Sequence, residues 1–350
     1  MKSQVKKLLG GRTALKIRQH SGAILRSTVA RLEGPYKINL HLLENSAALL
    51  QSTIYVVESL QLIKNRLAGL EQQNQAILKQ VTKDRIVRST GQYGSANPEI
   101  GLMTYLYAYL PSRNAVDVGA NAGQVSARLL EAGYTVYAFE PFPPVFERLR
   151  ERLGQNERFH ALQLALGRDD RKMDLHIAKA VSGSARHDDT TLYNSLVQHP
   201  MLDDLFFDGT TVEVSVRSLE SLWNASEIPE EIGLLKIDAE GYDLEVIRGM
   251  GPGRRPAVVL AEFWDASFVF GKAGALNRLE ELVSEMRRRE YHWHIVIYRT
   301  EEGEAISFYC NQDRSVENSW GNAFFFQDYS VFKEALQWCS ALLPPTYFTD

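Results

Sequence analysis

The stretch VDVGANAG at residues 116–123 decides the fold. A short apolar run enters a turn that contains Gly119 and Gly123, and a helical pattern follows over residues 122–132. The two glycines let the backbone approach a ligand closely, and the amides at the start of the next helix can donate hydrogen bonds to it. The stretch predicts the first strand, turn and helix of a ligand-binding α/β sheet.

Nicotinamide dehydrogenases also use such a turn, so its details must separate the possible cofactors. The spacing is Gly-x-Asn-x-Gly around Asn121, and the third glycine of a phosphate-binding loop is missing. Asp117 lies at the strand end, where its carboxylate would repel phosphates but could pair with the ammonium group of an amino acid. These features favour a nucleoside without a pyrophosphate. A nicotinamide-dependent oxidoreductase is the alternative enzyme class.

A second signal is Glu140, which ends the apolar run of YTVYAFEP at 134–141. It follows Gly123 by 17 residues. A carboxylate at this strand end can accept hydrogen bonds from both hydroxyl groups of a ribose. Glu140 is therefore predicted to bind the ribose of the cofactor, although an exposed strand-end acid without a role is the simpler interpretation of the residue by itself.

A third signal is LLKIDAEGYDLEVIRG at 234–249, a buried strand that runs into a helix. Lys236, Asp238 and Glu240 interrupt the end of that strand. Ligands of open α/β sheets bind at the carboxyl ends of the strands, so these side chains are candidates for the reaction. The structural alternative is a surface pair of Lys236 with Glu240 and a helix cap at Asp238.

Short apolar runs and helical stretches alternate along the rest of the chain, which is typical of parallel βαβ units in a sheet covered on both faces. The polar stretch 182–210 is interpreted as an insertion over the site. Further strand-like runs suggest an antiparallel finish to the same sheet. The expected strands lie near 114–118, 134–139, 159–164, 233–238 and 257–262, the expected helices near 98–110, 122–132, 143–153, 242–249 and 275–289, and the further strand-like runs at 172–178, 212–217, 291–299, 304–310 and 323–327.

Taken together, VDVGANAG, Glu140, VEVSVRSLESL at 212–222 and KIDAEGYD at 236–243 resemble the FkbM-type methyltransferases. The resemblance covers about residues 88–330. It implies a Rossmann-like class I methyltransferase fold of seven main strands, mostly parallel with the last antiparallel, and S-adenosylmethionine as the methyl donor. Members of the family methylate hydroxyl groups of sugars, natural products or cell-surface glycans, so the implied activity is O-methyl transfer.

The resemblance also implies roles for individual residues. It places Asp238 and Glu240, with Lys236 beside them, at the reaction face. Ala165 stands where the adenine ring would be contacted, although no acidic partner for the ring precedes Asp169. The implied cofactor-binding residues are Asp117, Gly119, Asn121, Gly123, Glu140 and Ala165.

Methyl transfer to a hydroxyl group requires alignment of the oxygen with the methyl carbon and a base for the hydroxyl proton. Asp238 is the first candidate for the base and Glu240 the second, while Glu262 and His187 are less favoured candidates. Asp238 and Glu240 could also hold a divalent metal. Because no third ligand is evident from the sequence, we expect no metal.

The clearest periodicity of the chain lies in residues 42–81, where steps of four and three alternate. Such a stripe predicts a coiled coil that joins copies of the chain as a parallel dimer or trimer, with Asn74 favouring one register and a low number of copies. The alternatives are an amphipathic helix packed on its own catalytic domain and, for the whole chain, a non-catalytic assembly protein. One heptad position holds Leu49, Val56, Ile63, Leu70 and Ile77, and the other holds Thr53, Leu60, Leu67, Asn74 and Val81.

Charge divides the chain into a basic leader and an acidic body. Residues 1–32 carry eight Lys and Arg and no Asp or Glu, so the remainder sums to −12 in a chain of net charge −4. An acidic body argues against nucleic-acid binding, whereas the leader could contact an anionic membrane. The leader has no apolar run long enough for a signal peptide or a membrane span.

These observations predict three parts: a basic leader at 1–41, a coiled-coil helix at 42–87 and a methyltransferase domain at 88–350, entered through a linker at 88–98. The chain has only two cysteines, without metal-ligand spacing. We therefore expect a cytoplasmic or membrane-peripheral homo-oligomer that acts on a small-molecule or glycan acceptor.

Overall fold

The computed structural model describes residues 36–90, 97–178, 190–197, 207–268, 277–300 and 306–346. The chain divides into two compact units, Met1–Leu78 and Lys79–Asp350. Residues 1–35 of the predicted leader, with the expected membrane contact, and His187 lie outside the described residues, whereas residues 36–41 belong to the helix that follows. In the described part of the chain, no helix combines the length and the apolar character needed to cross a membrane.

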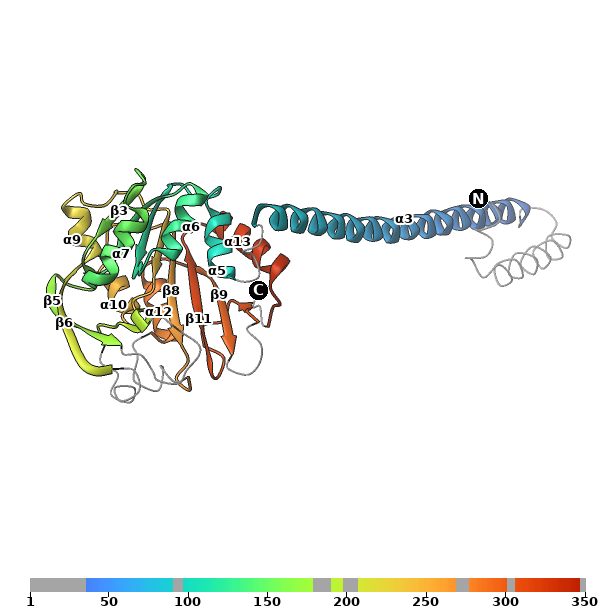
Figure 1. Cartoon of the computed structure of the whole chain (residues 1–350). Coiled ribbons are helices and arrows are strands. Elements are labelled where there is room, and N and C mark those ends of the chain that lie inside the picture. The colour runs from blue at the N-terminus through green and yellow to red at the C-terminus, as the bar shows by residue number, and fades with distance from the viewer. Residues whose placement is uncertain are drawn as a thin grey trace. The chain divides into compact units, whose positions relative to one another are not determined.

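The long helix α3 (Tyr36–Thr90) spans 55 residues and includes the whole segment predicted as coiled coil (Figure 1). Its sequence contains no proline, and Gly69 is its single glycine. Helices of this length in solution draw most of their stability from packing of an apolar face rather than from propensity. The predicted helix is confirmed.

The second unit is built on an eight-stranded sheet of order β10-β9-β11-β8-β7-β1-β2-β3. The neighbours from β8 to β3 pair in parallel, while β11 lies antiparallel between β8 and β9. This arrangement is the class I methyltransferase fold with its last strand reversed, and β10 adds an edge strand to it. The strands are β1 (Asn114–Val118), β2 (Thr135–Phe139), β3 (Phe159–Leu162), β7 (Leu234–Ile237), β8 (Val258–Trp264), β9 (Trp293–Thr300), β10 (Phe308–Cys310) and β11 (Ser319–Phe326).

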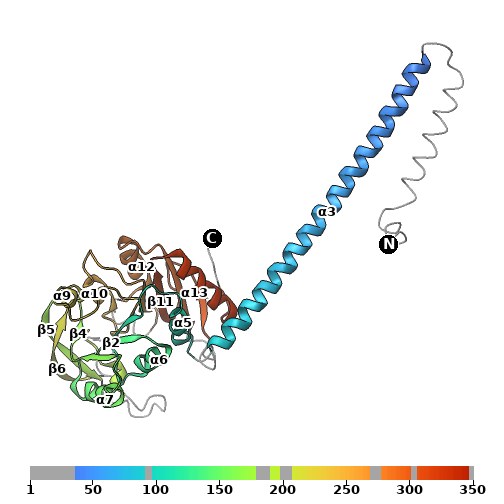
Figure 2. The same ribbon diagram turned by 90° about the horizontal axis from the view of Figure 1, so that it is seen from above.

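Helices cover both faces of this sheet because its strands are apolar on both sides. One face packs against α5, α6, α7 and α13, with Leu106, Leu129 and Trp338 completely buried. The other packs against α9, α10 and α12. Figure 2 shows α6 and α7 on one side and α10 and α12 on the other. The helices are α5 (Pro98–Leu106), α6 (Gln124–Ala132), α7 (Pro143–Leu153), α9 (Leu219–Asn224), α10 (Asp243–Arg248), α12 (Leu279–Arg288) and α13 (Tyr329–Leu342).

The prediction was wrong about two of the later strands. The runs expected at 172–178 and 212–217 form β5 (Arg171–Ala178) and β6 (Phe207–Arg217), which do not join the main sheet. They pair with β4 (Ala165–Leu166) in a separate three-stranded sheet. Alternation along a strand shows that it has a buried face, but the contacts that bury this face are non-local. Here they come from a small core that includes Leu175, Val214 and Tyr242.

The order of the main sheet also places the site. From β1 the chain proceeds to β2 and β3 on one side and returns to β7 and β8 on the other. The helices that leave β1 and β7 therefore lie on opposite faces, and a crevice opens at the carboxyl ends of these strands. All three sequence signals lie at this edge, after β1, β2 and β7.

Candidate active site

The turn after β1 is tied to the neighbouring strand ends. The amides of Gly119 and Ala120 both donate to the carbonyl oxygen of Phe139 at 3.0 Å. Gly119 has φ +67°, and a Cβ on it would lie 1.9 Å from the carbonyl oxygen of Asp238. The glycine is therefore required for the close approach of the β1 and β7 loops, and it also lines the cavity.

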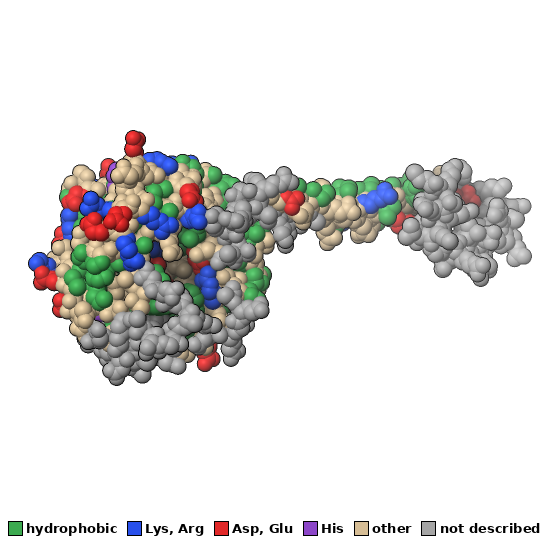
Figure 3. Space-filling view, viewed as in Figure 1, with side chains coloured by type: hydrophobic (Ala, Val, Ile, Leu, Met, Phe, Trp, Pro, Cys, Tyr) green, Lys and Arg blue, Asp and Glu red, His purple; other side chains and the backbone are tan. Residues whose placement is uncertain are grey.

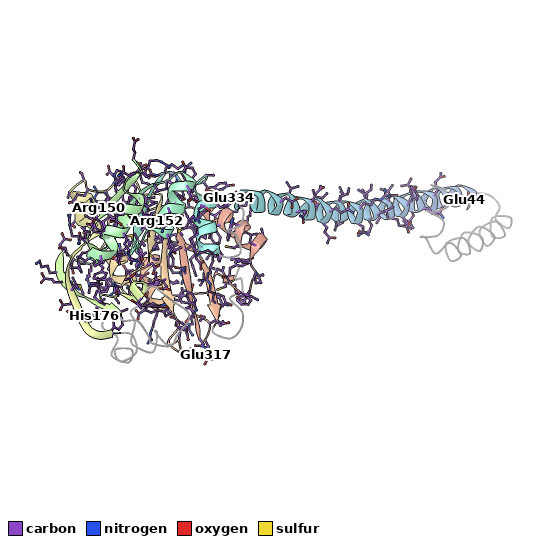
Figure 4. All side chains as sticks on the ribbon, viewed as in Figure 1. Glu44, Arg150, Arg152, His176, Glu317 and Glu334 are labelled. Atoms are coloured by element: carbon purple, nitrogen blue, oxygen red, sulfur yellow. The ribbon has the colours of Figure 1, made fainter. Side chains whose placement is uncertain are left out.

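Gly123 has a different role from the one predicted. Its φ is +80°, and an added Cβ would meet the side chains of Leu149 and Leu153 at 2.6 and 2.7 Å. It thus allows α6 to start against α7 and does not line the cavity. Arg152, marked on α7 in Figure 4, donates to the carbonyl oxygen of Ala122 at 3.1 Å and holds the turn from the same side.

Asp117 faces the protein interior and not the cavity. Its carboxylate is completely buried, accepts a hydrogen bond from the Ser126 hydroxyl at 2.6 Å, and lies 3.0 Å from the Lys236 ammonium group. The ammonium group that the sequence analysis sought in a ligand is therefore supplied by the chain itself. A buried carboxylate needs such a partner, because an unpaired charge in the interior costs several kcal/mol.

Lys236 connects the buried aspartate with the cavity. Its ammonium group lies 3.4 Å from Asp238 and donates to the carbonyl oxygens of Val118 and Gly119 at 3.2 and 3.3 Å. Burial alone would lower the pKa of Lys236, but the carboxylates of Asp117 and Asp238 outweigh it and raise the pKa above its ordinary value. Lys236 is thus a permanent cation that joins the β1 and β7 strand ends, and it is not suited to remove a proton.

Glu140 lies at the end of β2 and lines the cavity as predicted. One carboxylate oxygen accepts from the Asn121 amide at 3.0 Å and the other from the Phe142 amide at 2.9 Å. Burial raises the pKa of Glu140 to about 7, against the lowering effects of these two amides and of Lys236. Each oxygen keeps a second lone pair, so the carboxylate can still accept hydroxyl groups from a ligand.

Three carboxylates meet beyond the end of β7. One oxygen each from Asp238, Glu240 and Glu262 lie within 4.8 Å of one another. Glu240 has φ +47°, an uncommon backbone conformation for a residue other than glycine and one that is concentrated at functional sites. From the sequence, Glu262 is a less favoured candidate for the base, since it follows a different predicted strand. Only the pairing of β7 with β8 brings it to the other two.

Burial and mutual repulsion act on this acidic group together. Burial, followed by the charge of Asp238, raises the pKa of both Glu240 and Glu262 well above the ordinary value. The side chain of Asp238 is 41% exposed and is paired with Lys236. Asp238 is therefore the member of the group that combines access to the cavity with a fixed position.

Asp243 lies behind the acidic group and orders it. Its completely buried carboxylate accepts from the amides of Ala239 and Glu262 at 3.1 and 3.0 Å and from the Asn277 side-chain amide at 2.8 Å. Burial and the charge of Asp238 raise its pKa to about 6. Asp243 is not among the site residues predicted from the sequence, although its position as the first residue of a helix after the KIDAEG motif is a usable signal.

These groups surround one cavity at the switch point of the sheet. Apolar residues Ala165, Leu166 and Leu175 form one wall, and Asp238 and Glu240 lie among the polar residues of the cavity. Of the predicted cofactor residues, Gly119, Asn121, Glu140 and Ala165 line it, whereas Asp117 and Gly123 support it from behind.

The segment 190–197, part of the predicted insertion, also lines this cavity. It contains the short helix η1 (Thr190–Tyr193). The Asn121 side chain donates to the Thr191 hydroxyl at 3.3 Å, and the Ser195 hydroxyl donates to the carbonyl oxygen of Glu240 at 2.6 Å. The prediction of an insertion over the site holds for these residues, but no periodicity of the sequence marked Thr191 or Ser195 individually.

Two kinds of ligand suit this donor set. One is a nucleoside linked to an amino acid. The apolar wall fits its ring, the Glu140 carboxylate fits its ribose, and the polar turn after β1 fits its amino-acid tail. The carboxylates of Asp238, Glu240 and Glu262 could hold a divalent cation, because hard cations prefer oxygen ligands. The structure thus supplies the third acidic side chain that the sequence did not reveal.

Comparison with known proteins gives a family match over the same region. The model of the methyltransferase FkbM domain family matches residues 117–292. A 31-O-demethyl-FK506 methyltransferase of Streptomyces tacrolimicus is 30% identical over 188 residues, which cover 48% of this chain and 72% of that protein. Methyltransferase 1 of Beauveria bassiana is 27% identical over 173 residues, with coverage of 46% and 68%.

Two further comparisons cover less of the relative's own length. The 2-O-methyltransferase NoeI of Sinorhizobium fredii is 27% identical over 149 residues, which cover 40% of this chain and 58% of that protein. The crystal structure of an FkbM methyltransferase from Methylobacillus flagellatus aligns with a TM-score of 0.35 at 14% identity and covers 61% of this chain and 43% of that chain.

Proposed function

Because the chain belongs to the FkbM-domain methyltransferases, we propose that it transfers a methyl group from S-adenosylmethionine to a hydroxyl group of a sugar, a cell-surface glycan or a natural product. The observation that carries this proposal is one cavity lined by the β1 turn, by Glu140 and by Asp238. The family match argues against both alternatives of the sequence analysis, the nicotinamide oxidoreductase and the non-catalytic assembly protein.

Cofactor binding is assigned to the side of the cavity next to β1 and β2. Glu140 accepts the ribose hydroxyls with the lone pairs that the amides of Asn121 and Phe142 leave open. Ala165 and Leu166 offer an apolar surface to the adenine ring. The bound cofactor supplies a methyl group already activated by its positive sulfur. Asp117 contributes indirectly, since its ion pair with Lys236 fixes the turn.

The reaction is assigned to the carboxyl end of β7. Asp238 would accept the proton of the acceptor hydroxyl as the bond between oxygen and the methyl carbon forms and the bond from that carbon to sulfur breaks, which leaves the cofactor as a neutral thioether. Lys236 holds the carboxylate at 3.4 Å, and general base catalysis of this kind contributes about 100- to 10,000-fold. Glu240 and Glu262, whose pKa values are raised, can position acceptor hydroxyls by hydrogen bonds in either protonation state.

The acceptor class is supported by the chemistry of this end of the cavity. Carboxyl groups readily accept hydrogen bonds from hydroxyl groups, whereas an acceptor with phosphate groups near the reacting oxygen would be repelled. By name, one relative is a 2-O-methyltransferase and another is a methyltransferase of 31-O-demethyl-FK506. The two free, buried cysteines, Cys310 and Cys339, suit a cytoplasmic enzyme.

Isothermal titration with S-adenosylmethionine and with NAD tests the cofactor. We expect binding of the first and none of the second. Transfer of a labelled methyl group to a panel of hydroxylated acceptors then tests the reaction. Binding of NAD without binding of S-adenosylmethionine would overturn the proposal. Label that appears only on amino groups would overturn O-methyl transfer and indicate N-methyl transfer.

A further inference from the structure

Helix α3 exposes a continuous apolar face along its described length. Leu60, Ile63, Leu67 and Leu70 are between 53% and 59% exposed, and Leu49 reaches 72%. Figure 3 shows hydrophobic side chains following the helix, and Figure 4 shows its side chains standing out from the ribbon, with Glu44 towards the N-terminal end. Soluble proteins seldom leave apolar patches of this extent open to water, so a partner surface is expected.

The heptad register defines this face, which we call the seam. With Thr53 at position a and Val56 at position d, every following a and d residue up to Val81 is apolar except Asn74. No proline interrupts this stretch of the helix. The same helix in another copy of the chain offers a matching face, and a repeat every 3.5 residues keeps two such faces in contact.

We propose that α3 joins more than two copies of this chain in a parallel, in-register coiled coil. This inference is independent of the proposed activity, because it rests on α3 alone. Three features of the helix carry it: the polar residues of the seam, the charges beside the seam, and the choice and extent of its apolar residues.

The polar residues of the seam favour the parallel, in-register arrangement. Thr53 and Asn74 both occupy position a, so each meets its own copies when the helices run in the same direction without offset. The Asn74 side chains can then form hydrogen bonds with one another. In an antiparallel pair, a positions face d positions, and Asn74 would be buried against apolar side chains at a cost.

Charge complementarity points the same way. Arg66 at position g and Glu71 at position e of the next heptad lie five residues apart. In a parallel coiled coil, the g residue of one helix faces this following e residue of its neighbour, so an Arg66–Glu71 pair forms at each interface. Lys64, at the preceding e position, faces Ser59 and meets no like charge.

The apolar residues favour more than two helices. Leu60 at position a is followed by Ile63 at position d, a choice that shifts preference from dimers to trimers or tetramers. Leu50 and Val57, at position e, are 66% and 58% exposed. In a coiled coil of two helices, the contact covers positions a and d and leaves these side chains in water. In an assembly of three or more helices, the contact also covers more of positions e and g.

Light scattering on the full chain at micromolar concentration tests the assembly. We expect a mass of at least three times the 39.6 kDa of the chain. The variant Ile63→Glu with Leu67→Glu places charges in the seam and should reduce the mass to that of one chain. The matched control, Asn65→Glu with Gln72→Glu, adds the same charges at position f, away from the seam, and should leave the mass unchanged.

Cross-linking tests the direction of the helices. Thr53→Cys should form disulfide-linked pairs under mild oxidation, because copies of residue 53 meet in a parallel, in-register assembly. Gln51→Cys at position f is the control and should link far less. The native Cys310 and Cys339 are buried and do not compete.

Each other outcome contradicts a stated part of the proposal. A monomeric full chain would overturn the coiled coil and favour packing of α3 on its own catalytic domain. A mass of two chains would overturn the copy number. Equal linking of the residue 51 and residue 53 variants, or none at residue 53 in a chain that is oligomeric, would overturn the parallel register.

Discussion

The ammonium group of Lys236 lies 3.0 Å from the carboxylate of Asp117, and both side chains are almost completely buried. This ion pair joins the end of β1 to the end of β7 across the point where the order of the sheet reverses. Lys236 also reaches Asp238, so one cation links the structural aspartate to the proposed base. The geometry of the reaction face therefore depends on a contact inside the core.

Replacing Lys236 by methionine should lower the free energy of unfolding by roughly 3–5 kcal/mol, because it leaves the Asp117 carboxylate buried and unpaired. Urea denaturation at neutral pH measures the change. The double variant with Asp117→Asn should recover part of the loss. Lys172→Met, which removes an exposed pair with Glu213, should leave the free energy of unfolding nearly unchanged, because water already solvates both charges. A similar loss in both lysine variants would show that burial of the pair is unimportant.

Gly119→Ala should weaken binding of S-adenosylmethionine by at least about tenfold, since its Cβ would collide with the carbonyl oxygen of Asp238 and force the turn away from β7. Calorimetry measures the affinity, and circular dichroism checks the fold. Gly253→Ala is the control, because nothing lies within 4 Å of a Cβ at that position. Normal affinity and normal thermal stability of the Gly119 variant would contradict the need for this close approach.

Asp238→Asn should keep its affinity for the cofactor and lose methyl transfer by about 100- to 10,000-fold, because the amide cannot accept the hydroxyl proton. Turnover on an identified acceptor gives the rate. Asp174→Asn, an exposed residue of β5, serves as the control. If Asp238→Asn turns over normally, the base is Glu240 or Glu262, and the corresponding glutamine variants decide between them.

Glu140 should make cofactor affinity and stability depend on pH in opposite directions. Its pKa in the folded chain is about 7, so affinity should rise about tenfold between about pH 6 and pH 8 as the carboxylate ionises and accepts the ribose hydroxyls. The folded state holds the proton more tightly than the unfolded state. Its stabilising contribution is therefore complete below about pH 4.5 and is lost as the pH rises through about 7.

The variant Glu140→Gln should abolish this pH dependence of binding and weaken affinity by roughly 10- to 100-fold, the range for a hydrogen bond to a charged group. Titrations at several pH values compare it with Glu147→Gln, an exposed change on α7. An unchanged pH profile in Glu140→Gln would assign the titration to another group.

Methyl transfer should not depend on an added metal ion. Lys236 is shared between Asp117 and Asp238, and the raised pKa values of Glu240 and Glu262 allow protons, rather than a metal ion, to offset the charges of these two residues. Turnover with excess EDTA should therefore equal turnover without it. A loss that magnesium restores would show instead that Asp238, Glu240 and Glu262 bind a cation.

The sequence predicted those elements whose evidence is local. The strand, turn and helix around VDVGANAG, the strand-end position of Glu140 and the helix from 42 to 87 all follow from periodicity and turn residues within a short window. The structure confirms each of them as an element of the chain. It also confirms the reversed last strand, β11, which the family resemblance implied.

Features that depend on distant residues were not predictable in this way. The sequence shows only which residues precede and follow Asp117 and Glu262. In the folded chain, Asp117 is paired with Lys236, and Glu262 lies close to Asp238. The paired strands β5 and β6 likewise show the alternation of apolar and polar residues that any half-buried strand shows. This pattern could not reveal that they form a separate sheet. Periodicity determines which face of an element is buried, and only the tertiary packing decides what lies against that face.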